Sequence, residues 1–425
     1  MNANVDRDAV RACKTLALSA LILAGTCGRA IAGEVAVHGF GTIGAAYADK
    51  PEEWSFNRSL NQHVESNAVR ADLDSLIGLQ INYQPSASVE IVAQAAGQRL
   101  DDEAELNDYL QLGFVGWHPN SAWSVRLGRV NLDAYLISDH RVVGFTYQFI
   151  RPPTEYYARM PASLDGADVS RTWMSDGVQW LTKLFVGRTE NGTGDGRLNL
   201  WPVIGAVASR ESDGLLLRLS ALHGRTTKNI RALAPLMQGL QQMQALPVPQ
   251  VASEAAGMQQ ALTTRGMHTN YVAAAVAYDR HDWLMTAELN RSKVHGMPWI
   301  SFSSGYISAG RRIGAFSAYV TESVMHRDRK AFEAPDWATQ LAAFGPQAAQ
   351  QAQQLADGAA RAINTTAADQ ATTALGVRWD AAARLALKAQ WDHVRWRNQA
   401  SGLWLNADGH AGSANVFAVA ADFVF

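Results

Sequence analysis

The sequence predicts an all-β fold, a closed antiparallel barrel of about sixteen strands, and three observations predict it. Apolar and polar residues alternate along one segment after another, with the period of two that belongs to β-strands. Short turns and long connections also alternate between these segments. Finally, aromatic residues gather beside the short turns, where amphipathic rings sit well at a membrane interface: Tyr83, Trp117, Trp123, Trp180, Tyr278, Trp283 and Trp379.

The last segment, residues 412–425, shows the alternation most clearly. Phe417, Val419, Ala421, Phe423 and Phe425 fall on one face, whereas the other face is smaller and mixed. Successive side chains of a strand point to opposite sides, so this segment has one continuous apolar face.

The same period recurs in fifteen further segments, and the even total is what single-chain bacterial membrane barrels require. They are 34–48, 69–83, 88–98, 104–118, 121–130, 166–174, 178–188, 200–210, 214–225, 269–279, 282–294, 299–310, 313–325, 371–379 and 383–396. Tight turns at one end and longer loops at the other predict a transmembrane barrel, with short periplasmic turns and long extracellular loops.

Residues 1–32 are predicted to be a cleaved signal peptide, and the barrel domain to occupy 33–425. Basic residues precede an apolar run (16–25) too short to span a bilayer, and Ala30-Ile31-Ala32 offers a cleavage site. A lipoprotein signal ending at Cys27 is the competing interpretation, which Thr26 disfavours. Cleavage after Ala32 removes both cysteines, which excludes disulfides and thiolate chemistry from the mature chain.

The charge balance argues against nucleic-acid binding. Without residues 1–32 the chain has 33 Lys and Arg against 37 Asp and Glu, a formal charge of −4. Nucleic-acid-binding proteins carry a basic excess instead. No later run of eighteen apolar residues predicts a transmembrane helix.

The connection 131–165 is the predicted functional element. It is too long for an ordinary hairpin, and it carries charges among prolines and aromatics. The predicted constriction residues are Asp133, Asp139, Arg141, Arg151 and Glu155. Acids on an inward-folded loop facing bases on the wall would set a transverse field that selects solutes by charge and size. Salt bridging in a solvated loop is the competing interpretation.

Strand parity predicts the residues of the pore wall. A charged side chain facing lipid at mid-membrane costs about 2–4 kcal/mol for Arg or Lys, so charges opposite the apolar positions must face the lumen. The predicted wall residues are Arg70, Asp72, Asp74, Arg126, Arg218, Arg378, Arg384 and Lys388. Bases outnumber acids in this set, which predicts a weak anion preference.

The stretch Arg151-Pro152-Pro153-Thr154-Glu155-Tyr156-Tyr157, followed by Asp165-Gly166, resembles the third loop of proteobacterial porin-like proteins. The resemblance implies a homotrimeric sixteen-stranded porin in the outer membrane of a Gram-negative bacterium. It implies passive diffusion of small hydrophilic solutes or ions through a water-filled lumen that the third loop narrows. The implied partners are outer-membrane lipid, lipopolysaccharide and the barrel-assembly machinery, which would act through the strand ending at Phe425.

Two long loops, 226–268 and 326–370, carry apolar residues at helical spacing and predict short amphipathic helices. Packing over the barrel mouth is one interpretation. The other interpretation is a lid, or a surface that binds a partner. Under that interpretation the alternative function is a plugged barrel that acts in surface binding or adhesion.

No enzymatic activity and no cofactor is expected. The GxGxxG match at 39–44 lacks the helix and second buried strand that dinucleotide binding needs, so its glycines are taken as part of a bent first strand. The acidic cluster Asp101-Asp102-Glu103, with Glu105 and Asp108, is interpreted as a solvated charge run, with a divalent-ion site as the alternative. The scattered histidines show no metal-ligand spacing.

Overall fold

The structure is a computed structural model that describes residues 33–49, 54–59, 61–62, 67–100, 104–159, 161–193, 196–295, 301–328, 332–365, 369–397, 404–406 and 411–425. The predicted signal peptide and the acids at 101–103 lie outside the described residues.

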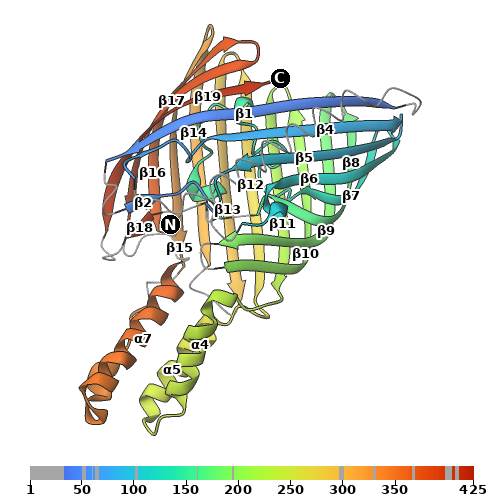
Figure 1. Ribbon diagram of the computed structural model, residues 1–425. Coiled ribbons are helices and arrows are strands. Elements are labelled where there is room, and N and C mark those ends of the chain that lie inside the picture. Colours follow the sequence, from blue (N-terminus) through green and yellow to red (C-terminus); the bar gives the residue numbers. More distant parts are fainter. Residues whose placement is uncertain are drawn as a thin grey trace.

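Sixteen long antiparallel strands and the two-residue β3 (Val69–Arg70) form one closed sheet (Figure 1). The long strands are β1 (Glu34–Ala48), β4 (Leu76–Ser86), β5 (Val89–Gln98), β6 (Leu110–Asn120), β7 (Trp123–Asn131), β8 (Ser163–Ser175), β9 (Val178–Thr193), β10 (Gly196–Ser212), β11 (Leu215–Thr226), β12 (His268–Arg280), β13 (Trp283–His295), β14 (Phe302–Ile313), β15 (Phe316–Arg327), β16 (Gln370–Ala382), β17 (Leu385–Trp396) and β19 (Gly412–Val424). Because β1 pairs with both β19 and β4, the sheet has no free edge. The all-β barrel prediction is confirmed.

The alternation in sequence becomes an outer and an inner face. Along β19, Phe417 and Val419 are exposed, whereas Val416 and Ala418 are buried in the interior. Apolar side chains thus cover the outside of the barrel, and such a surface suits a lipid environment.

The GxGxxG segment lies in β1, at the seam where the barrel closes. A β-carbon at Gly39 would collide with the ring of Phe425, and one at Gly41 with the ring of Phe423. The glycines therefore let the last aromatic residues lie across the first strand, as close backbone approach requires.

The predicted strand 69–83 is broken, which changes the parity on which its wall residues were assigned. A turn at residues 71–74 separates β3 from β4. Leu73 lies between the predicted wall residues Asp72 and Asp74, so strand parity would place it on the lipid face, but it is only 3% exposed and packs inside near Phe56 and Ile150. A second difference is that β9 and β10 extend far into residues 189–199, which separate the predicted strands 178–188 and 200–210.

Both predicted helical loops contain helices. The β11–β12 connection forms η2 (Arg231–Leu233), α4 (Ala234–Gln244) and α5 (Pro249–Leu262); the β15–β16 connection forms α6 (Trp337–Gln340), η4 (Ala342–Phe344) and α7 (Pro346–Thr365). They share one apolar core that includes Leu240, Met258, Trp337 and Ile363. Figure 1 shows α4, α5 and α7 extending away from the strand ends. None of the helices in the described part of the chain is long and apolar enough to cross a membrane.

Two smaller elements complete the long-loop end of the barrel. The short strands β2 (Trp54–Phe56) and β18 (Trp404–Asn406) pair with each other across two different loops. The one-turn helix α2 (Leu106–Tyr109) precedes β6.

Candidate functional site

The connection between β7 and β8 folds into the barrel and binds its wall at many points. It contains η1 (Gly144–Thr146) and α3 (Thr154–Tyr157). Side chains of β9, β11, β13, β14, β15, β16 and β17 all hydrogen-bond to it. These hydrogen bonds supply partners for buried donors and acceptors. Apolar side chains of the loop, among them Leu132 and Phe149, also belong to one buried cluster with Phe185, Val207 and Leu222 of the wall.

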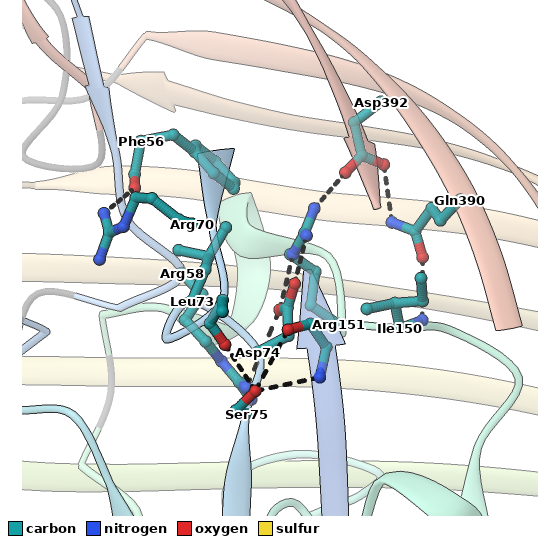
Figure 2. A network of polar contacts seen from close by, with 12 residues as sticks. Phe56, Arg58, Arg70, Leu73, Asp74, Ser75, Ile150, Arg151, Gln390 and Asp392 are labelled. Atoms are coloured by element: carbon teal, nitrogen blue, oxygen red, sulfur yellow. Dashed lines mark hydrogen bonds and ion pairs between the residues drawn. The ribbon is translucent and has the colours of Figure 1, made fainter. Parts of the chain in front are cut away.

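Arg151 forms the central ion pair of this loop (Figure 2). Its guanidinium donates to both carboxylate oxygens of Asp74, at 3.0 and 2.5 Å, and to Asp392 of β17 at 2.5 Å. Beside it, the backbone N–H of Ile150 donates to Gln390 at 2.9 Å. Burial alone would lower the pKa of Arg151, but the two carboxylates outweigh it and raise the pKa above its usual value.

Asp133 forms a second buried cluster near the start of the loop. Its carboxylate accepts from Lys183 of β9 at 2.6 Å and from Arg218 of β11. Burial works to raise the pKa of Asp133, and the two cations prevail and hold it below its usual range. The same holds for Asp74, whose pKa Arg151 keeps low against its burial.

The other three predicted constriction residues lie in different surroundings. Glu155 is 1% exposed and accepts from Ser323 at 2.6 Å and from Thr372. Asp139 is exposed and accepts from Asn131 at 2.6 Å. Arg141 donates to the carbonyl of Tyr157 at 2.7 Å. Asp133 and Arg151 of the predicted set are thus held in buried ion pairs, whereas hydroxyl groups of the wall bind Glu155.

Several predicted wall residues contact the backbone of the loop. Lys388 donates to the carbonyls of Gly144 and Phe149, both at 2.7 Å, and pairs with Asp422 at 2.8 Å. Arg378 donates to the carbonyls of Phe145 and Tyr147, at 2.7 and 2.9 Å. These cations donate hydrogen bonds to backbone carbonyls of the loop that have no secondary-structure partner. Because buried carbonyls need such donors, these contacts hold the loop inside the barrel.

The remaining wall residues separate into three kinds. Arg126 pairs with buried Asp168 across β7 and β8, at 2.5 Å. Arg70 pairs with Asp72 at 2.7 Å, in the segment around the 71–74 turn. Arg384 lies in the exposed turn between β16 and β17 and not on the wall, because β17 begins one residue later.

The sequence did not single out Glu288, which lies at the centre of a tyrosine cluster. Its carboxylate accepts from the N–H of Leu136 at 2.9 Å, from Tyr306 at 2.7 Å and from Tyr157. Its place on the inner side of β13, next to outward-facing Leu289, is the parity signal that would have found it.

A cavity of about 100 Å³ lies against the loop near the rim. Its lining includes five arginines, Arg58, Arg129, Arg141, Arg151 and Arg188, and three acids, Asp108, Asp165 and Glu190. The acids are all paired, with Arg197 or Arg129, at 2.6 to 3.0 Å. Two of the lining arginines, Arg129 and Arg151, are themselves paired with carboxylates, so the positive charge of the lining is partly neutralised by Asp165, Asp74 and Asp392. No group of three or more His, Cys, Asp or Glu suited to a metal ion occurs among the residues that the structure describes.

The two buried carboxylates predict how acid affects the loop. Because the pKa values of Asp74 and Asp133 are below the ordinary 3.8, their contribution to stability is complete above that pH and is lost as the pH falls through the lower folded values. We expect proteolytic protection of the loop to persist at pH 5 and to decline below about pH 4. Loss of this protection already between pH 7 and pH 5 would contradict the assignment.

Comparison with solved structures finds a similar fold in an outer-membrane channel. The outer-membrane channel DcaP of Acinetobacter baumannii superposes with a TM-score of 0.53 at 10% identity, over 92% of this chain and 97% of that one. OmpT of Vibrio cholerae, in its trimer form, gives 0.49 at 11% identity over 93% and 100%, and Pseudomonas putida OprB gives 0.46 at 9% over 92% and 94%. No protein-family model and no curated protein matches the sequence. The chain thus has the porin-like fold, a closed sixteen-stranded antiparallel β-barrel of the kind seen in DcaP.

Proposed function

We propose that the chain is a porin of a Gram-negative outer membrane, through which small hydrophilic solutes or ions diffuse passively. An apolar exterior and an interior that holds many charged and polar side chains support this role, since a membrane barrel must satisfy lipid outside and water inside. The loop 132–162 narrows the path, and the implied homotrimer belongs to the same proposal.

The arginine-lined cavity is the observation that supports a preference for anions over cations. Solutes that enter from the loop end meet these guanidinium groups, of which Arg58 and Arg188 lie outside the loop and Arg141 and Arg151 lie on it. A positive constriction lowers the energy of an anion and raises that of a cation. The proposed path is therefore anion-preferring, with the ion-paired loop setting its width.

Reversal potential under a salt gradient tests this preference. We expect chloride to permeate more readily than potassium, and the double variant Arg58→Gln/Arg188→Gln to reduce the permeability ratio by roughly twofold. The matched control, Arg395→Gln/Arg397→Gln, removes two charges that lie on exposed positions away from the cavity. A cation preference in the unmodified protein, or equal effects of both double variants, would contradict the proposal.

The projecting helices support a second candidate, a surface binding or adhesion protein. Helices α4, α5 and α7 bury a core of their own, and their glutamine-rich outer faces stay exposed. Deleting 231–262 together with 335–365 discriminates the two functions, because a channel keeps its conductance without the helices, whereas an adhesin loses attachment to its surface.

A further inference from the structure

The outward face of β11, β12 and β13 carries a basic cluster at the loop end of the barrel. Strand register places it in two rows, Arg225 with His268 and His295, and His223 with Asn270 and Lys293. Facing residues in adjacent strands have their β-carbons about 5 Å apart, so the six side chains form one patch. Five of the six are basic, and none is acidic.

The side chains of this basic cluster contact one another. His223 Nδ1 lies 2.7 Å from Asn270 Oδ1, and the amide nitrogen of Asn270 lies 3.2 Å from His295 Nε2. The rings of His223 and His268 stack at 5.4 Å. Asn270 thus links the histidines of neighbouring strands into a continuous polar surface.

The cluster differs from two other basic residues near the same rim, Arg291 and Arg395, which have acidic partners; Arg291 lies one row from Lys293 on the same face of β13. Arg291 pairs with Asp328 at 2.5 Å, and Arg395 with Glu322 at 3.1 Å. Within the described ranges, neither Arg225 nor Lys293 makes an ion pair with a carboxylate. Cations held together by strand register create a local positive potential that favours an anion from outside the chain.

The position of the cluster indicates which class of anion it would bind. One to two rows farther from the rim, on the same face, lie Leu219, Val272 and Leu289, which are 63%, 53% and 64% exposed. The surface thus changes from apolar to cationic along the strands. A lipid presents the same order, acyl chains next to a charged headgroup, and each basic residue near an anionic lipid surface contributes about one kcal/mol.

We infer that the basic cluster is a binding site for the phosphorylated headgroup of an outer-leaflet lipid. The inference rests on the membrane placement in the proposed function but not on the open channel. Arg225 and Lys293 supply the fixed charge, and the histidines and Asn270 supply hydrogen bonds to phosphate oxygens.

Binding of lipopolysaccharide to the refolded mature protein in detergent tests this site, with titration by microscale thermophoresis. We expect Arg225→Gln/Lys293→Gln to weaken binding about 30-fold, from two lost basic residues. The control Arg395→Gln/Arg397→Gln should change it less than about threefold. Enzymatically dephosphorylated lipopolysaccharide should bind weakly to all three proteins.

Two results would overturn the inference. Equal weakening by both double variants would show only a general charge effect. Inorganic pyrophosphate that displaces lipopolysaccharide at equal phosphate concentration would assign the cluster to a soluble anion. Bilayer conductance is measured in parallel, so that failure of the lipid site and failure of the channel can be told apart. If Arg225→Gln/Lys293→Gln changes neither conductance nor lipid binding, only the lipid site is rejected. If the unmodified protein conducts no current but still binds the lipid, only the channel is rejected.

Discussion

Replacing residues 134–161 by a short glycine-serine turn is expected to raise the single-channel conductance severalfold. This segment bonds to at least six strands, so it occupies much of the cross-section that a sixteen-stranded barrel would otherwise leave to water. The strands themselves form a closed sheet without the loop, which is why the variant is expected to keep the barrel.

The measurement is the current step size in a planar bilayer, with barrel formation checked by heat-dependent gel mobility. A matched variant shortens the β11–β12 connection instead, by deleting 231–262, and leaves the lumen loop intact. We expect its step size to stay close to that of the unmodified protein. Equal conductance before and after removal of 134–161 would show that this loop does not set the width of the path.

The second large effect is expected for Asp133→Asn. This carboxylate is 2% exposed and faces both Lys183 and Arg218, so the variant leaves two cations in the interior without their counter-charge. Removing one partner from a buried ionic cluster typically costs about 3–5 kcal/mol. We expect most of this loss to appear as local release of the loop, since the strand hydrogen bonds remain.

Hydrogen exchange of the loop amides measures that release. The control is Asp139→Asn on the same loop, because Asp139 is exposed and its contact is one amide at 2.6 Å. An exposed substitution of this kind usually changes stability by about 0.5 kcal/mol or less. If Asp133→Asn and Asp139→Asn give the same exchange rates, the buried cluster does not anchor the loop.

The barrel itself is predictable because the alternation of residues within each strand indicates which side chains face the lipid and which face the interior. Leu219 and Leu289 face outward and Ser220 and Glu288 inward for the same local reason, the period of two. This argument needs an unbroken strand. It therefore fails at the 71–74 turn, where Leu73 changes sides, and at Arg384, which lies one residue before its strand begins.

The path of the loop is not predictable in this way. Arg151 lies 77 residues from Asp74 and 241 from Asp392, and no periodicity links these three positions. Nothing in the sequence indicates that the hydrogen-bond donors to Glu155 are the hydroxyl groups of Ser323 and Thr372 and the side-chain amide of Gln370. For this carboxylate, too, the partners follow only from the fold. Charge and length indicated that the loop matters, whereas the pairing depends on how the closed sheet brings distant strands together.

Single-channel recording of the refolded mature protein in a planar bilayer tests the central claim most directly. The account predicts discrete steps, smaller than those of the variant that lacks 134–161, and a reversal potential of the sign that anion preference gives. A folded barrel that stays silent, and remains silent after the loop is removed, would contradict the claim that this chain is a diffusion channel.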